Sequence, residues 1–198
     1  MSGVIALQRR TITGWRSAWR CRPGGFAAVA PLSGARVVAA VGSVASPVRG
    51  SETTRATMRA LLEDLALVVG HEPAALLERG NAAFASAGLG RLDAVALLSR
   101  PDDRIPASVA GRGEPAPLVV APDTLTVPVR GSVVLDRGWA VVLGAADAPG
   151  LPHTLLSPGE VRQALGLLDP PSPASVAAPR TLLALNASRH PSRPAGVG

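Results

Sequence analysis

The sequence predicts an α+β domain in which β-strands form the core and helices cover it. The first observation is that the periodicity changes along the chain, from an apolar strand to two amphipathic helices, several short strands, a helix and a last strand. The second is composition: 47% of the residues are hydrophobic, yet Tyr is absent and Phe occurs twice. The core must therefore consist of Ala, Val and Leu, which suits a sheet flanked by helices. The third is length, because 198 residues suffice for one domain and are too few for two ordinary ones.

The first half of the chain predicts a strand followed by two helices. Residues 36–44 (RVVAAVGSV) are apolar and rich in Val, which is typical of a buried strand. A helix is expected over residues 52–69, with Ser51 as its cap and Gly70 at its end. A second helix has Pro73 in its first turn and extends to about residue 87.

The second half predicts short strands separated by Pro and Gly turns, at residues 92–99, 107–110, 117–121, 124–129 and 139–144. The capping box Ser157-Pro158-Gly159-Glu160 begins a helix that extends to about residue 168. A segment rich in Pro and Ser then leads to a last strand at residues 181–185.

The positive charge is concentrated at one end of the chain. All 20 basic residues are Arg, and the net charge is +6. No acidic residue precedes Glu52, and from there on 13 Arg face 14 acidic residues. A basic arm for an anionic partner is one interpretation; loss of acids from this stretch is the other. We expect a basic N-terminal segment (1–20), a domain (21–186) and a disordered tail (187–198).

Several classes of site are excluded by the residues themselves. Cys21 is the only cysteine, which rules out an internal disulfide framework and a Cys-based zinc site. His71, His153 and His190 lie far apart, without metal-ligand spacing. No P-loop, G-x-S-x-G or dinucleotide-binding glycine pattern occurs. Neither a secretory signal nor a membrane span is apparent, so we expect a cytoplasmic protein. The residues alone indicate an α+β domain without an active site.

Short motifs in a fixed order add a resemblance. Gly24-Gly25-Phe26 stands where G-G-D is expected, Val41-Gly42-Ser43-Val44 where G-D-V is expected, and residues 70–81 (GHEPAALLERGN) are similar to G-H-D-P-A-E-L-L-x-x-L-N. Residues 90–98, 113–120 and 135–144 follow in the same order. Together these motifs resemble the PPM-type serine/threonine phosphatase domain of the sporulation stage II protein E (SpoIIE-like) branch, over roughly residues 8–185. The resemblance implies a layered β-sandwich flanked by helices.

The resemblance also implies chemistry that this chain has altered. Family members hold two Mg²⁺ or Mn²⁺ ions with Asp carboxylates, and the metals generate a nucleophilic hydroxide. At three of the family's carboxylate positions this chain has Phe26, Ser43 and Ala146, and only Asp147 survives, if the alignment slips by one residue. The closing D-D-x-T motif is replaced by residues 178–181 (APRT), and Arg180 could occupy the vacated anionic pocket.

Two functions follow from the resemblance. The first is a pseudophosphatase without catalytic residues or metal, which acts in bacterial signal transduction as a regulatory protein-binding module. Its partner is expected to be an anti-sigma-factor antagonist or a kinase, and neither a membrane nor nucleic acid is expected to bind. The alternative is an active protein serine/threonine phosphatase that uses Mn or Mg with Asp147. The remaining possibilities are an unrelated α+β domain and a decayed open reading frame whose product folds poorly. The discriminator is whether Phe26, Ser43 and Ala146 converge on one end of a sandwich.

Overall fold

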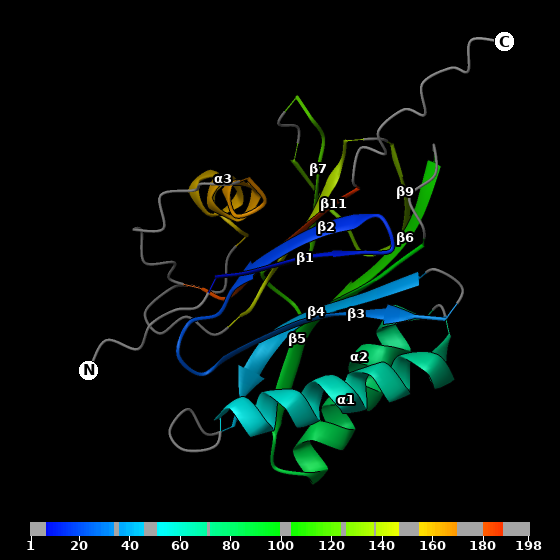
Figure 1. The fold of residues 1–198 in the computed structure, drawn as a ribbon, viewed down its shortest axis with the longest axis vertical. Helices are drawn as coiled ribbons and strands as arrows, with labels where there is room; N and C mark the ends of the chain where they lie inside the picture. Colours follow the sequence, from blue (N-terminus) through cyan, green and yellow to red (C-terminus); the bar gives the residue numbers. More distant parts are fainter. Residues whose placement is uncertain are drawn as a thin grey trace, which may run out of the picture.

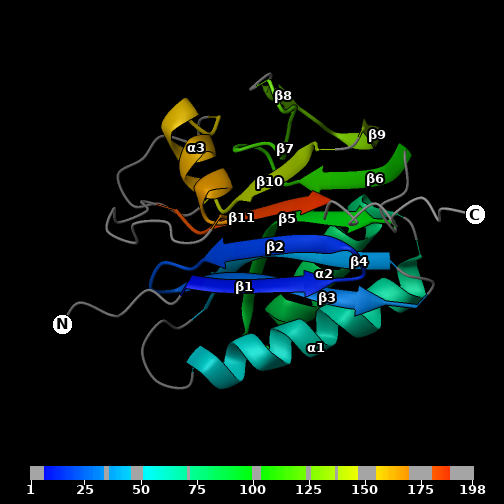
Figure 2. The same cartoon turned by 45° about the horizontal axis from the view of Figure 1, so that its top comes forward.

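Two antiparallel sheets pack face to face, with helices on the outside of both (Figures 1 and 2). The computed structural model describes residues 7–33, 36–45, 51–70, 72–99, 104–123, 126–136, 138–146, 155–169 and 180–187. The larger sheet has the order β1 (Leu7–Ile12), β2 (Trp15–Arg20), β11 (Leu182–Ala187), β10 (Ala140–Gly144), β7 (Leu118–Val120), β8 (Thr126–Pro128). The smaller has the order β3 (Gly25–Leu32), β4 (Arg36–Val44), β5 (Gly90–Leu98), β6 (Arg104–Gly111), β9 (Gly131–Asp136).

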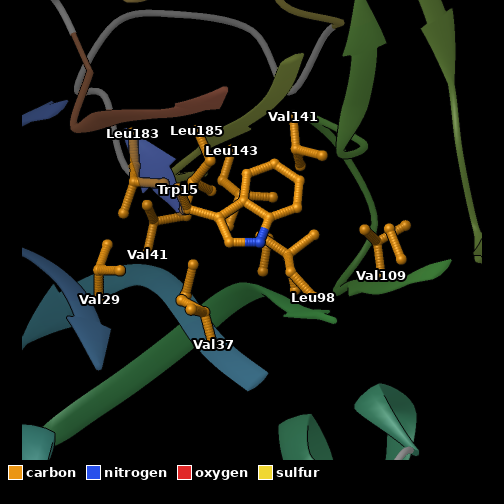
Figure 3. Close-up of a cluster of buried hydrophobic side chains, with 14 of the residues drawn as sticks. Trp15, Val29, Val37, Val41, Leu98, Val109, Val141, Leu143, Leu183 and Leu185 are labelled. Atoms are coloured by element: carbon orange, nitrogen blue, oxygen red, sulfur yellow. The ribbon is translucent and has the colours of Figure 1, made fainter. Parts of the chain in front are cut away.

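The main core lies between the two sheets. Alternate side chains of the central strands point inward, as the twofold period of β-structure requires. Trp15 is fully buried at its centre, among branched aliphatic side chains from both sheets (Figure 3). Its indole Nε1 donates to the carbonyl of Ser99 at 2.8 Å, so the one polar atom of this large side chain is satisfied.

The helices α1 (Ser51–Val69) and α2 (Pro73–Ser86) cover the outer face of the smaller sheet (Figure 1). Phe84 of α2 meets Phe26 of β3 in an edge-to-face contact, with ring centroids 6.3 Å apart. The third helix, α3 (Pro158–Gly166), covers part of the outer face of the larger sheet through Val161 and Ala164. The layers are therefore helix, sheet, sheet, helix, which is the predicted α+β sandwich.

The arginine-rich start of the chain is part of the larger sheet. β1 pairs with β2, and β2 pairs with β11 from the other end of the chain. The predicted boundary at residue 20 therefore separates two strands from the sheet that contains them. The sequence pattern does not predict these two strands, because Arg9, Arg16 and Arg20 occupy outward positions and leave no clear alternation of apolar and polar residues.

Two of these arginines bind the residues that directly follow α3. Arg9 Nε donates to the carbonyl of Leu167 at 2.6 Å, and Arg16 Nη2 donates to that of Leu168 at 2.5 Å. Arg16 also pairs with the carboxylate of Asp169 at 3.0 Å. The last carbonyls of a helix have no partner within it, and cations near them are stabilising. The positive charge of β1 and β2 is thus used at least partly to cap α3.

Most elements agree with the sequence-based prediction, and the exceptions have clear causes. Both long helices and the capping box are confirmed. β9 was not predicted as a strand, because its outer positions are exposed. The predicted tail was residues 187–198, but Ala187 belongs to β11. Residues 188–198 and all three histidines lie outside the described residues.

Candidate functional site

Four strands bring their ends together at one edge of the sandwich and border a half-open cavity of about 190 Å³. The turn before β3, the end of β4, the exit of β10 and the entry to β11 form its walls. The lining residues are Arg22, Pro23, Gly24, Gly25, Gly42, Ser43, Val44, Ala145 and Thr181. The sequence motifs G-G-F and G-S-V therefore meet in space, because β3 and β4 pair with Gly25 opposite Ser43.

Glycines allow the sheets to approach closely at this cavity. A Cβ atom on Gly25 would lie 1.9 Å from Thr181 Oγ1, so a hydroxyl from the opposite sheet fills the space of a side chain. A Cβ on Gly42 would lie 2.0 Å from the carbonyl oxygen of Arg91, where the pairing of β4 with β5 shifts register. Any other residue would require the Thr181 side chain to move at position 25 and the backbone of β5 to move at position 42.

The predicted site residues lie in different places relative to the cavity. Ser43 lines the cavity and is half-buried. Ala146 is buried directly after Ala145, which also lines the cavity. Phe26 lies at the same end of the sheet, but its side chain turns to the helical layer, where it packs on Phe84. Asp147 lies outside the described residues, as do the first two residues of the replaced D-D-x-T motif.

Asp93 of β5 is a buried carboxylate that sequence reasoning missed. Only 4% of the residue is exposed. Its Oδ2 accepts from the backbone N–H of Ala146 at 3.1 Å, and its Oδ1 lies 3.2 Å from Arg91 Nε. Asp93 falls between the pairs Val41–Ala94 and Gly42–Leu92, so it is the extra residue of a bulge. A lone acid in the apolar strand GRLDAVALL is the signal that could have identified it.

Arg180 serves a different purpose from the one the sequence suggested. The residue is 1% exposed, and its Nε pairs with Glu160 Oε1 at 2.9 Å. Glu160 also closes the capping box with Ser157 at the start of α3. Arg180 thus ties α3 to the entry of β11, and the neighbouring Thr181 is the residue that lines the cavity.

The groups around the cavity are neutral or basic. Arg22 lines it, and Arg55 of α1 donates from Nε to the carbonyl of Gly25 at 2.9 Å. Burial raises the pKa of Cys21, which precedes the cavity wall, to about 11 against the partly compensating charge of Arg55. Cys21 is consequently a neutral thiol and a poor nucleophile or metal ligand at neutral pH.

The described residues do not fit a pair of divalent metal ions. Hard cations such as Mg²⁺ and Mn²⁺ require several anionic oxygen ligands. Within the described ranges no three His, Cys, Asp or Glu side chains cluster closely enough to hold a metal. The described part of the cavity wall offers two hydroxyls, backbone groups and one guanidinium.

Comparisons with known proteins identify solved structures of similar fold. No family model and no curated protein matches the sequence. In the described part of the chain, no helix is long and apolar enough to cross a membrane. The phosphatase domain of the cell fate determinant SpoIIE from Bacillus subtilis is similar in structure, with 8% identity, a TM-score of 0.52 and 99% of both chains covered.

A second solved structure contains the RsbU and RsbW domains of a Mycobacterium tuberculosis protein. It is 19% identical over 84% of this chain, with a TM-score of 0.52. This chain spans 57% of the length of that structure. At 19% and 8% sequence identity, the similarity to these two structures concerns the fold alone. The chain has the fold of the PPM-type phosphatase domains that its sequence motifs resemble.

Proposed function

We propose that this protein is a pseudophosphatase, a PPM-type fold that acts as a regulatory protein-binding module instead of hydrolysing phosphate esters. The observation that carries the proposal is the wall of the cavity at the end of the sandwich. Its described residues include no carboxylate, and Ser43 stands where the resemblance expects one. A neutral hydroxyl cannot bridge two divalent cations, so metal-dependent generation of hydroxide is lost.

The contacts around the cavity support a site held together without metal. In a metal centre the ions draw loops from separate strands toward one another. Here Asp93 binds the backbone of Ala146, and Thr181 Oγ1 accepts from the backbone N–H of Arg22 at 3.2 Å. The Asp93 bond thus connects the two sheets at this edge, and the Thr181 bond ties the turn before β3 to the entry of β11.

The partner we propose is a protein of anti-sigma/anti-anti-sigma signalling in a bacterial cytoplasm. An anti-sigma-factor antagonist is the substrate class that the resemblance implies for active members, and a kinase of the same system is the other candidate. A module that keeps the fold and loses the metals would retain the surface around the cavity for such a partner. The test is to measure binding of a purified antagonist to this protein, with the antagonist in its phosphorylated and unphosphorylated forms.

One observation favours the alternative of an active metal-dependent phosphatase. Asp93 is a buried carboxylate that binds the backbone N–H of Ala146, the residue before Asp147 in the sequence. Asp93 is already paired with Arg91, which opposes its use as a ligand. Asp147 would have to replace the carboxylate ligands that Phe26, Ser43 and Ala146 do not provide.

Hydrolysis of a phosphoserine peptide by the purified protein in Mn²⁺ distinguishes the two functions. We expect no turnover above that of the Asp147→Ala variant, with or without a chelator. Turnover that a chelator abolishes and that Asp147→Ala removes would overturn the pseudophosphatase proposal. A Glu63→Ala variant is the matched control, because Glu63 lies on α1 and pairs with Arg59 there.

A further inference from the structure

The smaller sheet ends at β9, and the far side of this strand is unpaired among the described residues. β9 pairs with β6 on one side and is the last strand in the sheet order. In Figure 2, β9 lies at the border of the sandwich next to β6. Its side chains Ser132, Val134 and Asp136 are exposed, so the helices that cover the other strands of this sheet do not cover β9. An uncovered edge strand offers its backbone groups to another strand.

Pro106 of β6 determines which backbone groups of β9 point outward. Its carbonyl accepts the N–H of Ser99, which follows β5, so the polar groups of Pro106 face β5. In an antiparallel ladder, two opposite residues either bond each other or both point away from each other. Pro106 lies opposite Val134, so the N–H and C=O of Val134 point to the free side of β9. Those of Ser132 point the same way, two residues earlier in the strand.

The other sheet edges have features that prevent pairing, and the described residues of β9 have none of them. β1 has exposed arginines, which would repel those of a second copy. β3 contains Pro31, and β8 has three residues and ends in Pro128. Charged side chains, prolines and short length are the usual protections of an edge strand. Residues 131–135 (GSVVL) contain neither a charge nor a proline, and Val134 is 56% exposed.

The two ends of β9 have opposite charges. Arg130 precedes the strand and Asp136 is its last residue, and both are exposed. Arg130 pairs with Glu114 at 3.3 Å, but 67% of its side chain remains exposed, so this pair is weak and leaves room for a second acid. Antiparallel pairing of β9 with a second copy of itself brings the Arg130 end of each copy to the Asp136 end of the other. The charges of β9 are therefore complementary to those of a second copy.

One register satisfies the charges and the backbone groups together. With Val133 of one copy opposite Val133 of the other, Arg130 lies opposite Asp136 on both sides of the twofold axis. The same register places Ser132 opposite Val134, so their outward N–H and C=O groups bond across the new pair of strands. The exposed Val134 side chains of the two copies are then diagonal neighbours on one face, within reach of each other.

We propose that this protein forms a twofold dimer through β9, with a second copy of the chain supplying the partner strand. The two smaller sheets then become one continuous sheet. The described wall of the cavity includes residues of β3 and β4, which lie at the other side of the smaller sheet, and none of β9. The dimer therefore presents two cavities, and its formation does not depend on the proposed function of the cavity.

Sedimentation velocity of the full chain, at a series of concentrations on either side of about 100 µM, tests the proposal. One strand pair makes a small interface, so we expect a monomer–dimer equilibrium with a dissociation constant on the order of 100 µM. Val134→Pro removes an N–H that the bonds between β6 and β9 do not use, and it should weaken the dimer by about tenfold or more.

A matched pair of variants distinguishes β9 from another exposed apolar surface. Val134→Lys places a charge on the free edge, next to the same charge of the second copy, and should also prevent dimerisation. Val68→Lys makes the same change on α1, where Val68 is 75% exposed, and should leave the dissociation constant unchanged.

A charge exchange protects the test against a folding defect. Arg130→Asp and Asp136→Arg each place like charges opposite one another, and each should weaken the dimer by about tenfold. The double variant restores opposite charges and should return the dissociation constant to within about threefold of its original value. A misfolded strand would not recover in this way.

A chain that stays monomeric across the concentration series, or that assembles beyond two copies, overturns the proposal. A dimer that Val68→Lys disrupts and Val134→Pro does not overturns it too, since that dimer forms through α1. Failure of the double charge variant to recover the dimer has the same consequence. None of these results affects the pseudophosphatase proposal, which the Mn²⁺ and phosphopeptide assays test separately.

Discussion

Removal of the Asp93 carboxylate should loosen the connection between the two sheets. Asp93 is buried, and it accepts the N–H of Ala146 across the sandwich and pairs with Arg91 on its own strand. In Asp93→Ala the Ala146 N–H loses an ionic acceptor in a buried position, which costs about 1.5–3 kcal/mol. The Arg91 side chain is 40% exposed and can turn to water, so the ion pair adds only about 0.2–1 kcal/mol.

We therefore expect Asp93→Ala to lower the free energy of unfolding by about 2–4 kcal/mol. Asp93→Asn retains a neutral acceptor for Ala146 and should cost about 1 kcal/mol. Urea unfolding measures both, and an unchanged m-value would show that the folded state remains compact.

The control is Asp136→Ala on the exposed strand β9, which should change stability by less than about 0.5 kcal/mol. If Asp93→Ala is no more destabilising than this control, Asp93 does not hold the two sheets together.

Three further predictions concern other parts of the fold. Tyr and Lys are absent and Arg stays protonated, so Cys21 is the one side chain that titrates between pH 9 and 11. Because burial raises the pKa of Cys21 from 9.0 to about 11, its contribution to the free energy of unfolding is fully present below pH 9 and declines as pH rises toward 11. Cys21→Ser should therefore make the melting temperature depend less on pH in this range. Gly25→Ala should cost about 1–3 kcal/mol through overlap with Thr181 Oγ1, and Thr181→Ala in the same chain should recover part of it, in a double-mutant cycle by urea unfolding. Arg9→Gln should cost about 1 kcal/mol, because the carbonyl of Leu167 loses its donor, and circular dichroism melting would contradict this if the midpoint did not move.

The elements that sequence could predict are those with local signals. The capping box is an example: Ser157 Oγ accepts the N–H of Glu160 at 3.2 Å, and Glu160 Oε2 accepts the N–H of Ser157 at 2.8 Å. Both partners lie within one helical turn, so the pattern is complete in four residues. The long helices were predictable from an apolar stripe and from Gly70 and Pro73 at their ends.

The elements that sequence missed depend on distant partners. β2 pairs with β11, which lies far along the chain, and its outward Arg16 binds the carbonyl of Leu168 just after α3. No short window contains this information. β1 and β2 therefore appeared as a charged segment instead of two strands.

The residues of the candidate site also differ in whether a local sequence pattern could predict them. Ser43 was found because a short motif carries it, and the structure puts it in the cavity wall. Asp93 was missed because its role depends on a register shift that turns an apolar strand's one acid toward the opposite sheet. Phe26 occupies the expected position in the chain, but its side chain faces the helices, which a motif alone cannot reveal.

Titration of the purified full-length chain with Mn²⁺ tests the central claim most directly. A site without the family's carboxylates should bind no pair of ions, so calorimetry should detect no saturable heat and the melting temperature should not rise. Two bound ions that raise the melting temperature, both effects being lost in Asp147→Ala, would contradict the account.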